Sequence, residues 1–457
     1  MYALPGVLGL VIFILARPTD FFDALRGLPL LYIFFALALV GFVLDVRLGV
    51  TKLRPAPQLL WVLAFVIWCV ATATVQAPGS VLTGVVQLAI LLAIYVVIAQ
   101  GLPTFKAFEL VCASVLACSL FISAICVHQG LQPTTCVAVD QKDDQSAMGR
   151  PDGRVCESIE TCLQDPPEPQ ALYRCEHAGI FGVTSIAGGR VRYVGVLHDP
   201  NEVALAVAVS VPLAIAFYLR RKTRGRLIVA GISAVLAVAA IIMSQSRGGI
   251  LVFLGAVGVY FLRRYRWKGL LVGAVFALPV LLLGGRTGQT ASESTTERVE
   301  CWYEGLQMFR AHPLVGVGYG QFTEHHHLTA HNSLILAFAE NGVLGAITWT
   351  AAIYLSIKIP LDVLRTVRDP EGEVARTWAM ALLASLSGML IGTMFLSFNY
   401  HFVLWIYLGL AGALWTAVRR HVPGWKIDLG WRDAGILAAA NTVLMAGIYI
   451  YTRVTLG

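Results

Sequence analysis

Long apolar runs recur from one end of the chain to the other, and they constrain its fold more than any other feature. Most hold about 17 residues or somewhat fewer, enough for a helix to cross or nearly cross a hydrocarbon core roughly 30 Å thick. We count about thirteen of them, at residues 4–16, 28–44, 59–75, 81–99, 108–127, 203–219, 227–243, 250–262, 270–283, 334–357, 378–398, 402–418 and 436–451. The sequence therefore predicts an all-α, polytopic integral membrane protein with about 12–13 transmembrane helices.

Composition supports this class and excludes a soluble domain of ordinary make-up. Hydrophobic residues account for 57% of the 457 residues and charged residues for only 13%, against about 25% charged residues in typical globular domains. The first apolar run has neither a basic flank nor a small-residue cleavage pattern. We therefore expect it to be a membrane span rather than a signal peptide.

Lysine and arginine fall in alternate short connections, which sets the orientation of the spans. Such connections stay in the cytoplasm, and simple alternation puts five of them on one face, at residues 46–54, 220–226, 263–269, 364–368 and 419–426. Their attraction to anionic inner-leaflet lipid accounts for the net charge of +7. Nucleic-acid binding is not indicated.

The opposite, periplasmic face receives two long connections, 126–197 and 284–329, which have enough polar chain to build a site. The expected organisation is N-terminal transmembrane helices (1–127), a Cys-containing periplasmic loop (128–197), central transmembrane helices (198–284), a periplasmic loop that we expect to be catalytic (285–331) and C-terminal transmembrane helices (332–457).

Four of the nine cysteines, Cys136, Cys156, Cys162 and Cys175, lie in the first of these loops. The chain around them is polar and rich in proline, with little apolar sequence for a core of its own. On an oxidising face this pattern predicts one or two disulfides, whose pairing the sequence leaves open. A zinc site is the alternative, but no Cys-x-x-Cys pair and no suitably spaced histidine accompanies the cysteines.

Arg247 stands at the outer end of the seventh run, in the segment MSQSRGGI. A guanidinium group is costly at this boundary, and the simplest explanation is an anchor that reaches to water. The serines, glutamine and glycines around it instead favour close helix approach and a polar cavity. We therefore expect Arg247 to be functional.

The sequence of the second loop predicts a short amphipathic helix that begins with Arg298 and stops at His312. Its apolar stripe consists of Val299, Trp302, Leu306 and Phe309. We expect this helix to lie along the membrane interface. Gly316, Gly318 and Gly320 follow, and because their spacing is not that of a nucleotide-binding loop, we expect a tight turn.

A group of histidines precedes the tenth run. His325, His326 and His327 are adjacent, so their imidazoles cannot all face one metal ion, although a metal cluster there remains the alternative. His331 is the stronger candidate, because the start of a helix favours anionic ligands and a neutral imidazole, which accepts a proton. Glu340 lies roughly 13 Å further along a helix, too far for direct proton transfer. We expect it to hydrogen-bond within the helix bundle.

Three motifs, taken in order, resemble the signature of a known family. They are SQSRGG at 244–249, Arg298 with Trp302 followed by HPLVGVGYGQF at 312–322, and HNSLILAFAENGVLG at 331–345. Over roughly residues 193–364 the chain resembles the O-antigen ligase and O-antigen polymerase (Wzy) superfamily, which are integral-membrane glycosyltransferases of the GT-C type. The resemblance implies an enzyme of the bacterial inner membrane with its active site facing the periplasm.

The resemblance also implies a chemistry. Members transfer a glycan from undecaprenyl pyrophosphate without a metal or a nucleotide sugar, so no cofactor and no metal are expected. Carried over, Arg247 and Arg298 bind the pyrophosphate and His331 is the catalytic histidine. Guanidinium groups suit phosphate oxygens and stabilise their charge as the glycosidic bond breaks, which is work that a divalent metal does elsewhere.

A further segment, VRYVGVLHDPNEVALAV at 191–207, is similar to one in exopolysaccharide-type members. It adds substrate-binding candidates, to which we add Tyr319 from the glycine-rich motif; the set is Arg192, His198, Asp199, Asn201 and Tyr319. The Cys-containing loop and a span beyond the usual twelve or so depart from the family pattern.

We expect a surface polysaccharide polymerase that uses an acceptor glycan, with a flippase or chain-length regulator as protein partner. The DPNE segment and the lack of a large C-terminal periplasmic domain favour this reading. The alternatives are a ligase that transfers the polysaccharide to lipid A core and a protein O-oligosaccharyltransferase. Outside the enzyme class the alternative is a secondary transporter, but the sequence shows no internal hydropathy repeat and its polar residues gather at one face.

Overall fold

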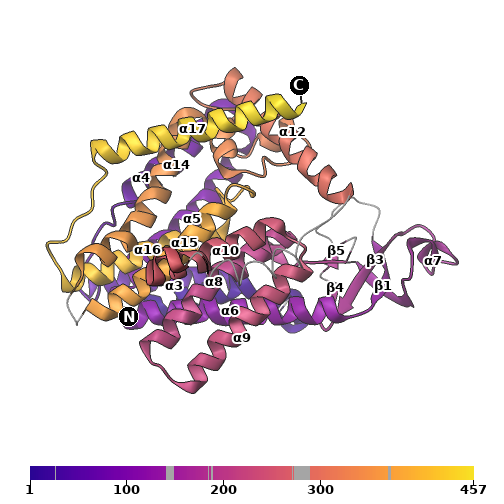
Figure 1. Cartoon of the computed structure of the whole chain (residues 1–457), viewed down its shortest axis with the longest axis horizontal. Helices are drawn as coiled ribbons and strands as arrows, with labels where there is room; N and C mark the ends of the chain where they lie inside the picture. The colour runs from indigo at the N-terminus through magenta and orange to yellow at the C-terminus, as the bar shows by residue number, and fades with distance from the viewer. Residues whose placement is uncertain are drawn as a thin grey trace. The chain divides into compact units, whose positions relative to one another are not determined.

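The computed structural model describes residues 1–25, 27–139, 149–183, 185–186, 189–269, 271, 289–368 and 372–456 (Figure 1). Its helices are α1 (Ala3–Ala16), α2 (Pro18–Phe21), η1 (Asp23–Leu25), α3 (Leu30–Arg47), α4 (Leu59–Gln76), η2 (Pro78–Ser80), α5 (Val81–Gly101), α6 (Phe105–Leu131), α7 (Ile159–Leu163), η3 (Gly195–Leu197), α8 (Pro200–Arg220), α9 (Arg224–Met243), α10 (Arg247–Tyr265), α12 (Gln289–Ala311), α13 (Phe322–His325), α14 (Ser333–Thr366), α15 (Glu373–Gly392), α16 (Phe402–His421) and α17 (Trp431–Leu456).

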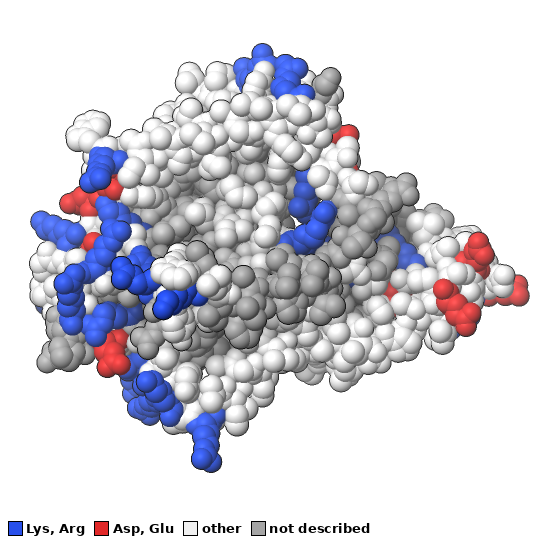
Figure 2. All heavy atoms as spheres, viewed as in Figure 1, with Lys and Arg blue, Asp and Glu red and all other residues white. Residues whose placement is uncertain are grey.

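Ten of the described helices are long and apolar enough to cross a membrane, and α1 is a shorter apolar helix. The all-α polytopic membrane fold is therefore confirmed. α10 coincides with the predicted run at 250–262, whereas the run at 270–283 falls, apart from residue 271, outside the described residues. In Figure 2 most of the visible helical surface carries no charged side chain, as expected for helices that face lipid.

The chain forms two compact units, which we describe one at a time. Unit 1 contains Met1–Leu10, Tyr32–Val111 and Thr287–Gly457, and unit 2 contains Val11–Leu31 and Cys112–Arg286. Neither unit is continuous in sequence, because α1 and α6 each contribute residues to both.

The centre of unit 1 is built from helices that are apolar on every side. α16 is buried along most of its length and packs against α5, while α14 packs against α4, α12, α15 and α16. A Cβ atom at Gly412 would lie 2.5 Å from the Ala99 Cβ, so glycine allows α16 and α5 to approach this closely. The C-terminal helix α17 runs alongside α14 and also contacts α12 (Figure 1).

The helix of the second loop was only partly predicted. α12 stops at Ala311, just before the predicted stop at His312, but it starts well before Arg298. Val299 and Leu306 of its apolar stripe are buried, and the helix packs against α14 and α17. The helix is therefore part of the packed helices of unit 1, and its expected place along the membrane interface stays a prediction.

In unit 2, α8 packs between α9 and α10 and is buried along most of its length. A Cβ at Gly249 would lie 2.3 Å from the Ala204 Cβ, so this glycine brings the first turn of α10 against α8. The close helix approach predicted around Arg247 is confirmed at this position.

The Cys-containing loop of unit 2 has a fold of its own, which the sequence did not predict. Its strands are β1 (Thr134–Val139), β2 (Arg150–Val155), β3 (Leu172–Gly179) and β4 (Gly182–Val183), which form an antiparallel sheet in the order β2-β1-β3-β4. A separate two-stranded sheet pairs β5 (Ser185–Ile186) with β6 (Arg190–Val191). Sulfur atoms and Tyr173 supply one small core of the larger sheet, and three valines another.

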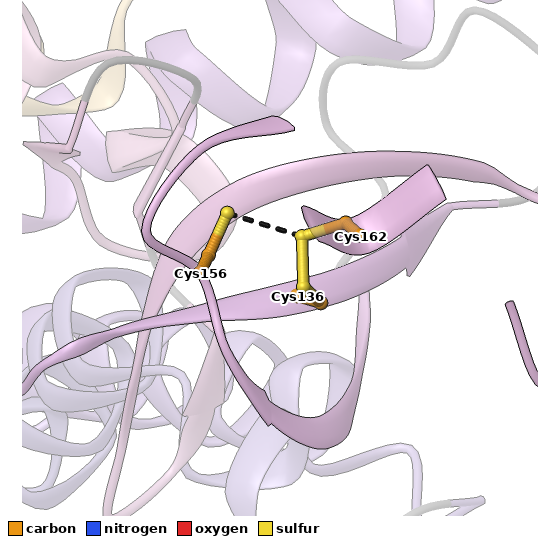
Figure 3. Close-up of side chains that lie close together, drawn as sticks. All are labelled: Cys136, Cys156 and Cys162. Carbon is orange, nitrogen blue, oxygen red and sulfur yellow. Dashed lines mark hydrogen bonds between the residues drawn. A yellow bond between two sulfur atoms is a disulfide. The ribbon is translucent and has the colours of Figure 1, made fainter. Parts of the chain in front are cut away.

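Two disulfides hold this loop together, within the predicted number of one or two: one joins β1 to α7, and the other joins the end of β2 to β3. They link Cys136 to Cys162 and Cys156 to Cys175, with Cα–Cα distances of 5.4 and 5.5 Å. Figure 3 shows how closely Cys136, Cys156 and Cys162 gather. Among the described residues this is the group close enough to hold a metal ion, but its sulfur atoms are used in disulfides.

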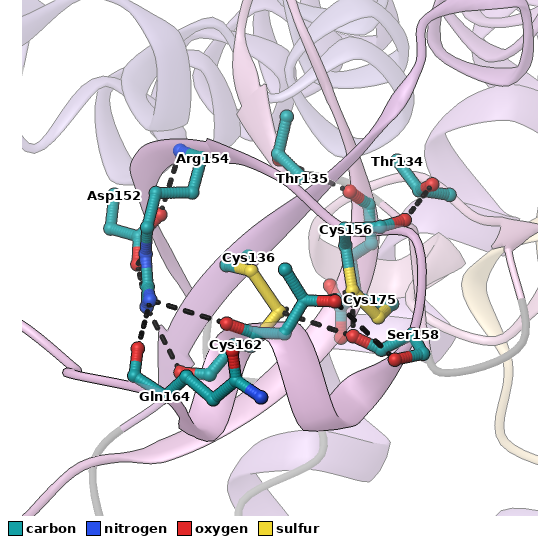
Figure 4. The surroundings of a disulfide bond; sticks show 12 residues. Thr134, Thr135, Cys136, Asp152, Arg154, Cys156, Ser158, Cys162, Gln164 and Cys175 are labelled. Atoms are coloured by element: carbon teal, nitrogen blue, oxygen red, sulfur yellow. Dashed lines mark hydrogen bonds and ion pairs between the residues drawn. A yellow bond between two sulfur atoms is a disulfide. The ribbon is translucent and has the colours of Figure 1, made fainter.

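An arginine fastens α7 to strand β2 beside the disulfides (Figure 4). The Arg154 guanidinium binds the Asp152 carboxylate at 2.6 Å and donates to the carbonyl oxygens of Cys162 and Gln164 at 3.0 and 2.8 Å. The small helix is therefore held by a charge-assisted network as well as by Cys162.

Candidate functional site

The glycine-rich motif at 312–322 docks onto a break in α14. Gly342 has φ 62° and ψ −164°, which interrupts the helix and releases carbonyl groups of the preceding turn. The N–H groups of Val317 and Gly318 donate to the Ala339 and Glu340 carbonyls at 2.8 and 2.9 Å. The motif thus replaces the hydrogen bonds that the helix loses.

Three glycines allow this close docking. Gly316, Gly318 and Gly320 all have positive φ, at 66°, 105° and 71°. A Cβ at Gly316 would lie 2.3 Å from the Glu340 backbone, so a side chain there would separate the two segments. The tight turn predicted at these glycines is confirmed.

Glu340 binds the same motif with its side chain. The buried carboxylate accepts hydrogen bonds from the Phe322 N–H at 3.2 Å, from the Gly320 N–H, and from the Tyr400 hydroxyl at 3.0 Å. The prediction that Glu340 hydrogen-bonds within the bundle is confirmed. These partners are two loop amides and a phenol, so the carboxylate positions the glycine-rich motif.

Tyr319 lies against this network. Its ring meets Tyr400 edge to face with centroids 4.6 Å apart, and its hydroxyl donates to the Gln87 side-chain oxygen at 3.1 Å. Burial raises the pKa of Tyr319 above its usual range, so the phenol stays neutral. These contacts orient Tyr319; its predicted role in substrate binding remains a prediction.

His331 lies two residues before α14, the helix that it was expected to begin. Asn332 is the N-cap of α14, because its side-chain oxygen accepts from the Leu334 and Ile335 N–H groups at 2.9 and 3.1 Å. His331 has φ 47°, a left-handed conformation that side chains rarely adopt. Its imidazole is therefore not needed for capping, and the backbone strain is of the kind that clusters at functional sites.

Arg298 is carried by a helix that packs against the start of α14. Gly305 of α12 faces Ile335, four residues after His331, and Arg298 lies two turns before Gly305, about 10 Å along the helix. One turn from Arg298, the Cys301 thiol lies 3.8 Å from the His326 Nδ1. Unit 1 thus places Arg298 on a helix that packs against α14, the helix that His331 precedes.

In unit 2, Arg247 is the first residue of α10. The Ser246 hydroxyl caps this helix by accepting from the Gly249 N–H at 3.0 Å, and it donates to the Asn201 side-chain oxygen at 2.7 Å. Gln245, the residue before the cap, has φ 52°. The Arg247 side chain is exposed at this helix start.

The start of α8 lies beside the start of α10. Asp199 caps α8 in a capping box with Glu202, and the Asn201 N–H donates to the Asp199 carboxylate at 2.6 Å. Because Asn201 also binds Ser246, two helix N-termini with the same dipole sense meet near Arg247. Such a place favours anions. Asp199 and Asn201 therefore have clear structural contacts, and their substrate roles remain predictions.

Two buried arginines precede this pair of helix starts. Arg192 donates to the His198 carbonyl at 3.4 Å, while the His198 side chain is exposed. Arg190, which the sequence analysis missed, donates through Nε to the Ser244 carbonyl at 3.2 Å, three residues before Arg247. Its only signal in the sequence is the Arg-Val-Arg alternation of a strand too short to be recognised by pattern.

Glu176 on β3 faces this basic group. Burial raises the pKa of its carboxyl to about 6, and the charges of Arg192 and Arg174 oppose that rise. At neutral pH the carboxylate is therefore largely ionised beside Arg192. It offsets part of the positive charge of this group.

The fold and these helix starts define a multi-pass membrane protein that presents arginine side chains and a strained histidine next to helix N-termini. Residues 232–350 match the family model for O-antigen ligase. The match contains Arg247, Arg298 and His331, and the resemblance inferred from the motifs is confirmed. No curated protein matches the chain.

The family match sets the class of activity. It makes the protein a membrane glycosyltransferase-like enzyme of the surface-polysaccharide ligase or polymerase type. Enzymes of this class take a lipid-linked glycan and an acceptor.

Proposed function

We propose that the protein is a surface polysaccharide polymerase of the bacterial inner membrane. It transfers a glycan from undecaprenyl pyrophosphate to an acceptor glycan on the periplasmic side, with His331 as base and Arg247 and Arg298 on the pyrophosphate. The observation that carries the proposal is the start of α14, where Asn332 caps the helix and the preceding residue, His331, has a left-handed backbone of the kind found at functional sites.

The proposed reaction is a single displacement at the anomeric carbon. The acceptor hydroxyl oxygen attacks this carbon while its proton passes to the His331 imidazole. The bond between the anomeric carbon and the pyrophosphate oxygen breaks, and undecaprenyl pyrophosphate leaves with the electron pair. Guanidinium groups stabilise the leaving group by paired hydrogen bonds to phosphate oxygens.

The basic group of unit 2 supports the phosphate role of Arg247. Two helix N-termini and the buried Arg190 bring positive potential to this position, of which the capping carboxylates of α8 offset a part. The proposal needs no metal at the site, because fixed cations supply the charge. Transfer by purified protein should therefore continue in excess EDTA, and its rescue by one particular divalent ion after loss in EDTA would contradict this.

Arg-to-Lys variants test the phosphate role directly. Lysine keeps the charge and loses the two-pronged hydrogen bonding, so R247K and R298K should each lose most activity in transfer from a lipid-linked donor. R224K, at an exposed position in the first turn of α9, is the matched control and should transfer normally. Near wild-type rates in both site variants would remove the pyrophosphate role.

The acceptor distinguishes the two members of the class. The DPNE segment, similar to that of exopolysaccharide-type members, supports a polymerase, whereas a ligase that uses lipid A core is the alternative supported by the family description. A deletion strain should accumulate single-unit chains on the lipid carrier if the protein is a polymerase. Full-length polymer left on the lipid carrier would identify a ligase.

A further inference from the structure

An apolar cavity lies between α17 and the helices of unit 1 that it packs against. It has a volume of about 700 Å³ and is bounded by α12, α14 and α17, within the range of about 300–1,000 Å³ that ligand pockets have. Leu306 and Phe309 line it from α12, and Phe338 and Ile347 line it from α14.

The cavity is elongated along α17. Ala434, Ala438, Asn441, Met445 and Tyr449 line it at spacings of three and four residues, so they form one stripe of the helix. This stripe covers about 22 Å at 1.5 Å per residue, most of the thickness of a hydrocarbon core. The cavity therefore has the length and the narrow form of a lipid chain.

The chemistry of the lining also fits a hydrocarbon chain. The polar group at its middle, the Asn441 amide, already donates to the Thr350 hydroxyl at 3.0 Å. An apolar cavity gives water too few hydrogen-bond partners to stay filled. The opposite side of α17 is exposed at Val443 and Ile450, as expected for a helix that faces lipid.

One end of the cavity leads toward Arg298. Trp302 on α12 and Met445 on α17 pack against the same apolar cluster, and Met445 also lines the cavity. Arg298 lies one turn beyond Trp302 and about 12 Å along α12 from Leu306. A chain that occupies the cavity can thus place a phosphate group at Arg298.

We propose that this cavity holds the hydrocarbon chain of the lipid-linked donor while Arg298 binds its pyrophosphate. The inference rests on the proposed function, since it assigns a place to the donor's lipid. It commits to this occupant because the cavity and the proposed phosphate ligand are carried by the same helix, α12. An ordinary membrane phospholipid is the competing occupant, because Arg310 also lines the cavity.

Photolabelling of the full-length protein tests the proposal. The probe is undecaprenyl pyrophosphate that carries a diazirine on its prenyl chain, and labelled peptides are identified by mass spectrometry. Label is expected on α17 between Ala434 and Tyr449 and on α12 near Leu306 and Phe309. A438W fills part of the cavity and should reduce labelling on the order of tenfold, the effect of losing burial of about two CH₂-sized groups.

Two further variants distinguish a filled cavity from a misfolded protein. V443W places the same side chain on the lipid-facing side of α17 and should label like wild type. A438L adds less volume and should give an intermediate loss. Unchanged labelling in A438W, or label confined to other helices, overturns the proposal. Displacement of the label by phosphatidylglycerol as readily as by unlabelled undecaprenyl pyrophosphate also overturns it, in favour of a phospholipid.

The outcomes separate this inference from the proposed function. Transfer that remains intact while α17 is unlabelled removes the cavity as the donor-chain site and leaves the polymerase proposal standing. Label on α17 with no transfer from any pyrophosphate-linked donor removes the polymerase proposal and leaves the cavity as a lipid-chain site.

Discussion

The Glu340 carboxylate accepts a hydrogen bond from the Phe322 backbone N–H at 3.2 Å, although 18 residues separate them. The contact joins the end of the glycine-rich motif to the broken helix that His331 precedes. A buried carboxylate with loop amides and the Tyr400 hydroxyl as donors is well satisfied, and it stabilises a loop that has little regular structure of its own.

Replacement of Glu340 by glutamine should lower the free energy of unfolding by about 1–3 kcal/mol, because an amide N–H₂ would then face donors that need an acceptor. The thermal midpoint of the detergent-purified protein measures this effect. E324Q, at an exposed position in the same loop, is the control and should melt like wild type. Identical midpoints for E340Q and E324Q would contradict the stabilising role of the Glu340 carboxylate.

His331 and Asn332 should separate activity from stability. H331G removes the imidazole and relieves the left-handed backbone, so the protein should fold at least as well as wild type. If the imidazole is the base, its transfer rate should fall on the order of 10²-fold. An active H331G protein would leave leaving-group stabilisation as the whole of catalysis.

Asn332→Ala should show the opposite behaviour. Loss of the cap on α14 should cost about 0.5–2 kcal/mol of unfolding free energy while the imidazole stays in place. Thermal midpoints and transfer rates of H331G and N332A, measured side by side, check both halves of the argument. H327A, an exposed neighbour, should change neither.

Removal of the Cys136–Cys162 disulfide should loosen the Cys-containing loop alone. The double variant C136S/C162S should lose about 2–5 kcal/mol of local stability, as small disulfide-held folds do. Hydrogen exchange at residues 134–139 and 172–179 measures it. C118S, which changes a thiol outside any disulfide, should leave these amides protected.

Glu176 gives the same loop a dependence on pH. Its folded-state pKa of about 6 lies above its ordinary value of 4.5, so the folded loop holds the proton more tightly than the unfolded chain does. The resulting stabilisation is complete below pH 4.5 and is lost as pH rises through 6. Hydrogen exchange of β1 and β3 at pH 4.5 and pH 7 should show this, and E176Q should abolish the difference.

The membrane helices could be predicted because each is specified by its own residues. The run expected at 59–75 appears as α4 (Leu59–Gln76), and that expected at 402–418 appears as α16. Burial of backbone polar groups in lipid forces such a run to become a helix whatever its neighbours are. Local composition was therefore sufficient for the all-α class.

The sheet of the Cys-containing loop could not be predicted in this way. β1 pairs with β3, so Cys136 stands opposite Cys175, 39 residues further along the chain. Pairing over such a distance leaves no periodic signal in a short polar strand. The disulfides that stabilise the sheet depend on a partner choice that the sequence leaves open.

The sequence predicted the candidate site residues but not the residues that hold them in place. Motif resemblance nominated His331. That Asn332 and not His331 caps α14 depends on the exact residue at which the helix begins, which the sequence does not fix. Arg190 was missed because its contact with the Ser244 carbonyl joins segments 54 residues apart. Sequence patterns identify chemically capable side chains, whereas tertiary contacts decide which of them hold the others in place.

The docking of the glycine-rich motif on α14 fixes the lengths of the two segments in contact as well as their conformations. Val317 reaches the Ala339 carbonyl while the Val343 N–H reaches the Pro313 carbonyl, so both ends of the contact are tied. One residue inserted or deleted within either segment would shift every pair out of register. Along lineages of this protein, the number of residues between 313 and 317 and between 339 and 343 should therefore stay fixed, as should the glycines at 316 and 342. Insertions and deletions are therefore expected in the loops outside these two segments.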